Sequence, residues 1–296
     1  MRIDKRLIQL YALKTYGESG PKSLQNLLVY FGSFEGIIRA SLDELVKVQG
    51  ISKLKARKLL RVRGMLKRAE EDLSLIQKAG IMIISVFDEE YPPRLLKIGD
   101  PPSMIFYRGR LPKFTESALA VVGTAKPSEK GISAAVEIGK LLASRGITVV
   151  SGLASGIDAS AHIGSLKADG YTVAILGSGL LNIYPKENIP LANMVEQSGC
   201  LMSEFHPEAK VSKGQLIARN RLIVALSSAI IAVELSDDSN GTLNAIKRAN
   251  EQGKVSYLYD PLGKLSIEGQ AHSKVVSFRS IDELEELLEY LVISGD

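Results

Sequence analysis

The stretch ITVVSGLASGIDASA, residues 147–161, decides the fold that this sequence predicts. Its first residues form a β-branched run that is typical of a buried strand. Gly152 and Gly156 stand at the two sides of a turn, and Asp158 is a good N-cap residue for the helix that follows. A strand that enters a helix through a glycine-rich loop presents backbone N–H groups at the positive end of that helix. The stretch therefore predicts a phosphate-binding turn, while a tight turn made for packing alone stays an alternative.

The alternation of strand and helix continues on both sides of this stretch. Segments with helical spacing separate six apolar segments that predict strands: 118–123, 147–152, 172–177, 200–205, 229–235 and 254–259. Residues 272–278 predict one more strand, and residues 280–291 a closing helix. Near-continuous apolar strands that alternate with helices are typical of a parallel sheet covered on both faces. We therefore predict an α/β fold with a doubly wound, mainly parallel sheet.

The carboxyl ends of the predicted strands carry the candidate binding loops, because ligands of such sheets lie beyond those ends. Four of the five loops that follow the first five strands are rich in Gly, Ser or Thr, more than turn formation requires. The loops are Gly123–Ser128, Ser151–Asp158, Gly177–Asn188, Ser203–Lys210 and Glu234–Thr242. This concentration favours a shared anion-binding cleft.

The first 70 residues differ from the rest in charge. They hold 15 Lys or Arg against 6 Asp or Glu, whereas the remaining residues hold 22 against 27. Short helical segments end in VQGISKLKARKLLRVRG, the pattern of a helix–hairpin–helix element whose hairpin offers N–H groups to phosphates. The predicted secondary DNA contacts are Gly50, Ser52, Lys53 and Lys55. A small helical interaction domain whose hairpin only turns the chain is the alternative.

The composition changes again between residues 71 and 117. The pairs Pro92-Pro93 and Pro101-Pro102 argue against helix there, so we assign this segment as an extension of the following sheet. The predicted division is a helical domain over 1–75 and a sheet domain over 76–296. No linker of low complexity separates them.

Composition excludes several classes of function. The single Cys200 forms no internal disulfide, and it shows no metal-ligand spacing with His162, His206 or His272, so neither a metal nor a cofactor is expected. The N-terminus lacks the apolar region of a signal peptide, and the longest apolar run, 222–235, is too short to span a bilayer. We expect a cytoplasmic protein without membrane contact.

Three motifs resemble the DprA/Smf family of DNA-processing proteins. They are SGLASGIDASAH, GSGLLNIYPKEN and IARNRLIVALSS, in this order and spacing. The segment IISVFDEEYPPRLLKIGDPPSMIFYRG is similar to the family's stretch before its Rossmann-like domain. The resemblance implies an extended Rossmann-like domain that dimerises and an N-terminal SAM-like or helix–hairpin–helix domain. It also implies single-stranded DNA binding, loading of a RecA-type recombinase and a role in natural transformation and recombination.

The family motifs are kept unevenly in this chain. The usual Gly-Ser-Arg loop reads Gly123-Thr124-Ala125, so that Lys126 is the nearest cation. The Phe-Pro that precedes the family's Arg-Asn-Arg is replaced by Leu216-Ile217, and Pro-Gly after the sixth strand by Asp260-Pro261. The C-terminal winged helix that some members carry is not expected here. We therefore expect a divergent member. The DNA- and phosphate-binding set that the loops and the resemblance predict is Gly123, Thr124, Lys126, Ser151, Gly152, Gly156, Lys186, Asn188, Arg219, Asn220, Arg221, Gly241 and Thr242.

Other polar residues near these loops have two interpretations each. Arg219 and Arg221 lie two positions apart and point to different helix faces, so one reaches the cleft while the other pairs inside the protein. His162 is expected to be structural, and Tyr184 either stacks on a base or packs over its loop. Glu234 faces the cleft as an acceptor for a base or ribose, or as a partner of an arginine.

We predict a non-enzymatic single-stranded DNA-binding protein with no catalytic residues. The alternative is a nucleotide-binding sensor or an enzyme resembling the Lonely Guy phosphoribohydrolases. Those enzymes carry a Gly-Thr-x-x-Glu loop, whereas Gly241-Thr242 is followed by Leu243, Asn244 and Ala245, which removes the acid/base group. An interaction scaffold with a vestigial cleft is a third possibility.

Overall fold

The computed structural model describes residues 3–112, 117–235, 240–262 and 274–293. The chain divides into two compact units, Met1–Tyr91 with Gly99–Phe106 and Pro92–Ile98 with Tyr107–Asp296. The predicted boundary between 75 and 76 falls inside the helix Leu66–Lys78, and the division into independently folding domains stays a prediction. Two predicted segments, 236–239 of the fifth loop and 272–273 of the last strand, lie outside the described residues.

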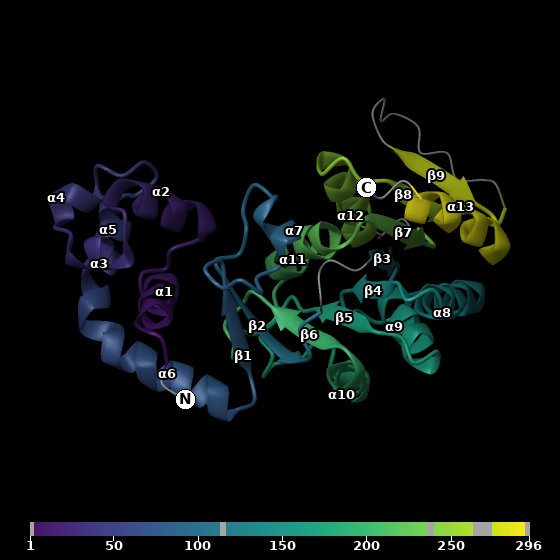
Figure 1. Ribbon diagram of the computed structural model, residues 1–296, viewed down its shortest axis with the longest axis horizontal. Helices are drawn as coiled ribbons and strands as arrows, with labels where there is room; N and C mark the ends of the chain where they lie inside the picture. The colour runs from purple at the N-terminus through teal and green to yellow at the C-terminus, as the bar shows by residue number, and fades with distance from the viewer. Residues whose placement is uncertain (1–2, 113–116, 236–239, 263–273, 294–296) are drawn as a thin grey trace. The chain divides into compact units, whose positions relative to one another are not determined.

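The first unit is mainly helical (Figure 1). Apolar side chains at helical spacing, among them Leu10, Leu27 and Leu73, are fully or almost fully buried in it. A capping box of Ser41 and Glu44 is present at the start of a one-turn helix. The elements are α1 Lys5–Thr15, α2 Pro21–Phe31, α3 Phe34–Arg39, α4 Leu42–Leu45, α5 Lys53–Arg61, η1 Val62–Met65, α6 Leu66–Lys78 and β1 Met82–Ser85; β2, Met104–Gly109, begins in this unit.

The expectation that the proline pairs exclude helix was wrong at one of them. Pro93 opens the short helix α7, Pro93–Leu96, with Pro92 as its N-cap residue. Proline suits the first helical position because the N–H that it lacks would have no partner there and its fixed φ is already helical.

The second unit contains the predicted doubly wound sheet, and the α/β fold class is confirmed. Seven parallel strands lie in the order β6-β5-β4-β3-β7-β8-β9. Their bounds are β3 Ala118–Gly123, β4 Thr148–Ser151, β5 Thr172–Ile175, β6 Cys200–Ser203, β7 Ala229–Val233, β8 Ser256–Tyr259 and β9 Val275–Phe278. In strands β3 to β8 buried side chains occupy both faces, so both faces need a cover of helices.

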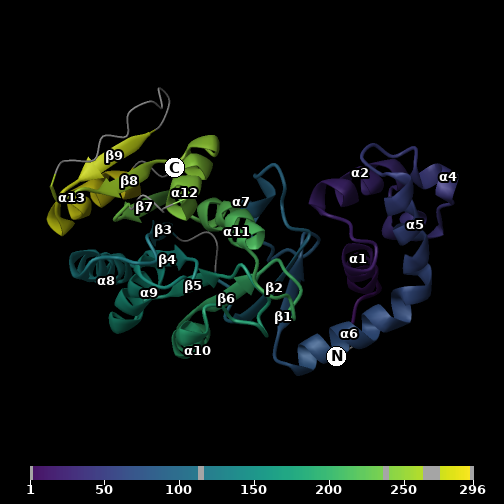
Figure 2. The same ribbon diagram turned by 180° about the vertical axis from the view of Figure 1, so that it is seen from behind.

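Helices cover both faces of this sheet (Figures 1 and 2). Leu119 and Val121 of β3 pack with α8 and α13 on one face, whereas Val122 points to the other face, near Ile223 of α11. The helices are α8 Glu129–Ser144, α9 Ile157–Lys167, η2 Lys186–Asn188, α10 Ile189–Ser198, α11 Lys213–Leu226, α12 Asn240–Glu251 and α13 Ile281–Ile293.

The strand order fixes where a ligand can enter. From β3 the chain proceeds through β4, β5 and β6 in one direction, and the later strands β7, β8 and β9 continue from β3 in the other. The order therefore reverses between β3 and β7, where Gly123 lies beside Val233. The loops that follow two such strands diverge, so this switch point is where open α/β sheets bind ligands.

Candidate nucleic-acid interface

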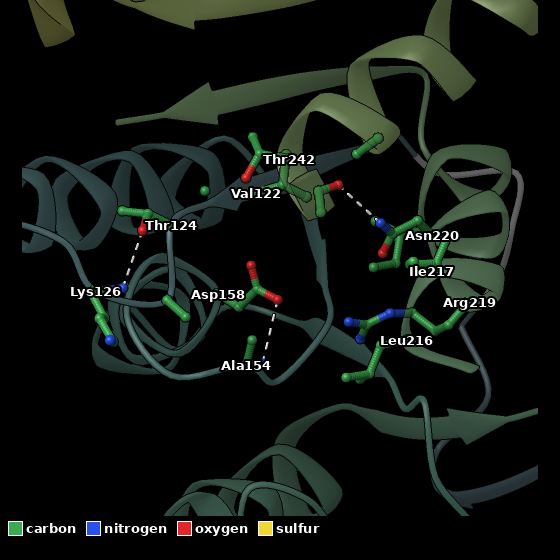
Figure 3. A pocket seen from close by; sticks show the side chains of 15 residues that line it. Val122, Thr124, Lys126, Ala154, Asp158, Leu216, Ile217, Arg219, Asn220 and Thr242 are labelled. Carbon is green, nitrogen blue, oxygen red and sulfur yellow. Dashed lines mark hydrogen bonds between the residues drawn. The ribbon is translucent and has the colours of Figure 1, made fainter. Parts of the chain in front are cut away.

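A cavity of about 500 Å³ opens at the switch point between β3 and β7 (Figure 3). Its wall comes from the end of β3, the loop before α9, helix α11 and the first turns of α12. The residues that line it are Val122, Gly123, Thr124, Ala125, Lys126, Ala154, Asp158, Leu216, Ile217, Arg219, Asn220, Ile223, Gly241, Thr242 and Ala245. Seven of the thirteen predicted DNA-binding residues are among them. The structure thus brings together segments that are far apart in the sequence.

Gly156 joins two of the cavity loops. Its backbone has φ +79° and ψ −124°, a conformation that side chains rarely allow, and a Cβ here would lie 2.5 Å from the carbonyl oxygen of Thr124. The N–H of Ile157 donates to that same carbonyl oxygen at 3.2 Å. Gly156 is the N-cap residue of α9, so the prediction that Asp158 caps this helix was wrong. Asp158 stands at the second helical position, and its Oδ2 accepts from the N–H of Ala154 at 3.3 Å.

Arg219 ties the sheet edge to helix α11. Its Nη1 donates to the carbonyl oxygen of Gly152 at 2.5 Å and to that of Ile175, at the ends of β4 and β5. A Cβ at Gly152 would lie 2.1 Å from Nη1, so the glycine makes room for the guanidinium. The side chain is 5% exposed. Arg219 therefore forms part of the cavity wall: its Nη1 is engaged by two carbonyl oxygens, whereas its buried Nε has no hydrogen-bond partner in the described part of the chain.

Asp158 faces Arg219 across the cavity (Figure 3). Burial raises the pKa of the Asp158 carboxyl, and the positive charge of Arg219 partly offsets this shift. Burial also lowers the pKa of Arg219, against the effect of Asp158. A buried carboxyl beside the one buried guanidinium of the described lining leaves the cavity floor with little net positive charge. Phosphate groups are consequently expected at the rim and not on the floor.

Arg221 points away from the cavity. Its Nη1 and Nη2 each lie 2.7 Å from a carboxylate oxygen of Glu204, in a bidentate ion pair whose side chains are 8% and 12% exposed. A planar guanidinium that is paired in this way has no fork left for a phosphate. We therefore leave Arg221 out of the proposed DNA-binding set.

Two exposed lysines stand near the cavity. Lys126 lines it on the side opposite Arg219, while Lys186, the first residue of η2, lies outside the lining. The Lys186 segment is attached to the loop after β4, since Asn188 Nδ2 donates to the carbonyl oxygen of Leu153 at 3.0 Å. Asn188 occupies the N-cap position of α10 but does not cap it with its side chain. These lysines are the cations best placed for a phosphate.

The remaining predicted residues have structural contacts. Ser151 Oγ donates to the carbonyl oxygen of Val121 at 2.6 Å, which uses its hydroxyl proton within the sheet. Thr124 Oγ1 accepts from the N–H of Lys126 at 3.2 Å and shapes the first loop. Asn220 Nδ2 donates to the carbonyl oxygen of Gly241 at 3.0 Å, which joins α11 to α12, and Thr242 is 4% exposed.

Glu234 has a role that neither interpretation foresaw. Its carboxylate accepts from the N–H of Ser128 at 2.9 and 3.0 Å and from the Ser128 hydroxyl at 2.9 Å, so it satisfies donors at the start of α8. Its backbone φ is +52°. A carboxylate at a helix N-terminus also interacts favourably with the helix dipole.

Two cations that the sequence analysis missed hold the far end of α11. Lys254 Nζ donates to the carbonyl oxygens of Val224, Ala225 and Ser227 at 2.6, 3.0 and 2.6 Å. Arg94 Nη1 donates to the carbonyl oxygen of Leu226 at 2.9 Å. Burial, with the charges of Arg94 and Lys97, lowers the pKa of Lys254 to about 8. The sequence around these two residues does not predict this role, because Arg94 precedes α11 and Lys254 follows it, both far away along the chain.

Comparison with known proteins decides the family. A family model described as DNA recombination-mediator protein A matches residues 82–287, more than half of the chain. The chain belongs to this family.

Curated relatives of this family member include Protein Smf of Synechocystis, 34% identical over 236 residues that cover 78% of this chain and 59% of that protein. The DNA processing protein DprA of Bacillus subtilis is 34% identical over 195 residues, or 64% of this chain and 65% of that one. The chain thus spans less than two thirds of the length of these relatives. The structure of DprA from Streptococcus pneumoniae is 25% identical, with a TM-score of 0.74 and coverage of 98% and 94%. The structure of DprA from Helicobacter pylori, a protein with a single-stranded DNA binding mode of its own, shares the fold at 22% identity, a TM-score of 0.61 and coverage of 71% and 96%.

Two further observations on this recombination-mediator family member concern metal binding and membrane spans. Over the described ranges, no group of three or more His, Cys, Asp or Glu side chains is arranged to hold a metal ion. No helix within those ranges is long and apolar enough to cross a membrane.

His162 of this family member is buried next to the cavity floor. It is 0% exposed, and its Nδ1 lies 2.6 Å from Thr172 Oγ1, which itself donates to the carbonyl oxygen of Val149. The hydroxyl proton is thus used, which assigns the ring proton to Nδ1. Burial, with the charge of Arg219, lowers the pKa of His162 to about 3.

This burial predicts an acid-sensitive fold. The unfolded state takes up a proton at His162 below a pH of about 6.5, while the folded state does not, so stability falls as the pH drops from there towards 3. The slope should be roughly 1.4 kcal/mol per pH unit. In urea unfolding between about pH 7 and 5, the wild-type stability should fall with a slope that approaches this value below about pH 6, and His162→Asn, whose amide replaces Nδ1, should lose this contribution. Equal slopes in the two proteins would contradict the assignment.

Proposed function

We propose that this protein binds single-stranded DNA at the carboxyl edge of its sheet and is not an enzyme. The observation that carries the proposal is the cavity at the β3–β7 switch point with exposed Lys126 at its rim and exposed Lys186 on the neighbouring loop. Membership in the recombination-mediator family supports it, and so does the single-stranded DNA binding of the Helicobacter pylori protein, which shares the fold.

The geometry favours different parts of the DNA at the rim and on the floor of the cavity. Lys126 at the rim and Lys186 on the neighbouring loop, which we call the rim lysines, take phosphates together with the loop N–H groups, since neither lysine has a carbonyl or carboxylate partner among the described residues. The floor, with Asp158 and Arg219 opposed, suits an uncharged sugar or base better than a phosphate. Tyr184, which is 49% exposed beside Lys186, is available to stack on a base.

The rim lysines predict a measurable salt dependence. The double substitution Lys126→Glu/Lys186→Glu should reduce the slope of log K against log salt for a single-stranded oligonucleotide by roughly 1.4, because each lost phosphate contact removes about 0.7. Fluorescence anisotropy titrations at several salt concentrations measure this slope. Lys167→Glu/Lys247→Glu changes the net charge equally at exposed positions outside the cavity lining and serves as the control. An unchanged slope in the rim variant would reject the rim as the phosphate site.

A free nucleotide is the second candidate ligand, because a cavity of about 500 Å³ is large enough for a mononucleotide. Hydrolysis of its glycosidic bond is not proposed. Ala245 lines the cavity, 1% exposed, at the position where the resemblance to phosphoribohydrolases requires a glutamate. Incubation with nucleoside monophosphates and analysis for free base distinguishes the two, since release of base at catalytic rates would overturn the non-enzymatic proposal.

The family membership extends the proposal to partners. A recombination mediator delivers single-stranded DNA to a recombinase, so we propose a RecA-type recombinase as the protein partner, natural transformation or recombination as the process, and the cytoplasm as the place. We also propose a homodimer. Light scattering with and without the recombinase and single-stranded DNA tests both points, and a monomer at micromolar concentration would count against the dimer.

A further inference from the structure

Helix α5 of the first unit carries its cations on two different faces. Its sequence, KLKARKLLR, has five Lys or Arg in nine residues and no acidic residue. Two of the cations have partners within the unit: Lys55 Nζ donates to Ser23 Oγ at 2.6 Å, and Lys58 forms a surface ion pair with Glu18. Burial lowers the pKa of Lys55. Lys55, one of the predicted DNA contacts, is therefore engaged within the unit.

The other three cations form a stripe on the outer face, which we call the outer stripe: Lys53, Arg57 and Arg61. They lie four residues apart, so that they succeed one another at about 6 Å along the axis and within about 80° of arc. All three are exposed, and none has a hydrogen bond or ion pair to another residue in the described part of the chain. Leu54 and Leu60, 67% and 39% exposed, flank the stripe on the same face.

The outer stripe is not arranged to stabilise its own helix along its whole length. Lys53 stands in the first turn, where the helix dipole disfavours positive charge, whereas Arg61 stands in the last turn, where the dipole favours it. Like charges four residues apart also repel by a few tenths of a kcal/mol. The N–H groups of Lys53 and Leu54 have no partner among the described residues, because Ser52 caps only the N–H of Lys55. Anions placed along this face would relieve each of these costs.

The turn before α5 is exposed and has a fixed conformation. Gly50 has φ +80° and is exposed, while the next residue, Ile51, is buried and anchors the turn. A similar turn before α2 has Glu18 at φ +47° followed by buried Ser19. The side chain of Asn26, in α2, donates to the carbonyl oxygen of Gln49 at 3.0 Å and joins α2 to the turn before α5. The stripe therefore starts at a fixed, exposed edge and not at a frayed helix end.

We propose that the outer stripe binds the phosphate backbone of duplex DNA, as a second nucleic-acid surface apart from the cavity of the other unit. Three evenly spaced cations match a row of like-charged phosphates. Helix α5 has no aromatic residue, and proteins that hold single strands combine cations with aromatic side chains on which bases stack. Duplex DNA keeps its bases stacked internally and offers the denser row of phosphates.

The test compares the full-length wild type with Lys53→Glu/Arg57→Glu/Arg61→Glu on a duplex and on a single strand of the same sequence. For the duplex, the slope of log K against log salt should fall by about 2–3. For the single strand it should change by less than about 1. The matched control, Arg6→Glu/Lys67→Glu/Lys78→Glu, changes the net charge equally at exposed positions of the same unit and should leave the duplex slope unchanged.

Four outcomes would overturn the proposal. The first is that the wild type does not bind the duplex at low salt, and the second is that the stripe and control variants have equal salt slopes for the duplex. The third is that the stripe variant loses duplex and single-strand binding equally. The fourth is that the wild type binds polyglutamate as tightly as the duplex, which would assign the stripe to an acidic protein. Circular dichroism melting, together with the uncharged Lys53→Gln/Arg57→Gln/Arg61→Gln variant, separates lost binding from lost folding. A failure of the cavity proposal remains distinct, because it appears in the Lys126→Glu/Lys186→Glu variant on single strands.

Discussion

Substitution of Arg219 by alanine is expected to lower the free energy of unfolding by about 3–5 kcal/mol, because it breaks a buried charge arrangement by removing one partner. The Asp158 carboxyl would lose its facing positive charge, and the carbonyl oxygens of Gly152 and Ile175 would lose a donor. Urea unfolding measures the change. Lys213→Ala, at an exposed position at the start of the same helix, is the control and should change stability by less than about 0.5 kcal/mol.

A second variant tests the electrostatic coupling of the two side chains. In Asp158→Asn/Arg219→Leu, neither charge is left unpaired, so the double substitution should cost less than the sum of the two single ones. A loss below about 1 kcal/mol in Arg219→Ala would contradict the structural role. The prediction also matters for function. Weaker DNA binding by an Arg219 variant would result from collapse of the sheet edge, whereas weaker DNA binding by Lys126 or Lys186 variants would result from lost phosphate contacts.

Gly156→Ala is expected to destabilise the protein by about 2–6 kcal/mol, the sum of backbone strain at positive φ and of overpacking. The new Cβ would lie 2.5 Å from the Thr124 carbonyl oxygen and 2.6 Å from Pro127, both in the neighbouring loop. Backbone atoms cannot move aside as a flexible side chain can, so the loops at 124–127 and 152–156 must separate. The free energy of unfolding, measured with urea, and the affinity for single-stranded DNA should therefore both decrease in Gly156→Ala.

The control for this substitution has the opposite expected sign. Gly214 lies in the first turn of α11, and nothing lies within 4 Å of a Cβ placed there. Gly214→Ala should leave stability unchanged or raise it by up to about 1 kcal/mol, because alanine costs less conformational entropy in a helix. A similar loss in both variants would show that the position of Gly156 has no special requirement.

The sheet was predictable because buried parallel strands leave a strong local pattern. Segments such as 118–123 and 229–233 are apolar on both faces, which the sequence displays directly. The place of the cavity followed as well, since the carboxyl ends of parallel strands meet at one edge. The helix start at Gly156 was missed because Asp158 is the better N-cap residue by type, while the observed cap depends on a glycine backbone conformation.

The division of roles among the charged residues was not predictable in the same way. Arg219 and Arg221 have the same local pattern, and only the folded chain brings Gly152, Ile175 and Glu204 within reach of them. Glu234 similarly meets Ser128, which lies 106 residues before it. Such partners depend on strand order and register, which local periodicity does not encode.

The central claim is that the strand-end loops around the β3–β7 switch point hold single-stranded DNA. Ultraviolet cross-linking of a single-stranded oligonucleotide to the full chain, followed by mass spectrometry of the cross-linked peptides, tests it most directly. The account predicts cross-links in peptides that contain Ala125–Lys126, Tyr184–Lys186 or Gly241–Thr242, and their loss under competition with unlabelled single strand. Cross-links confined to the opposite end of the sheet, or to the first unit alone, would contradict it.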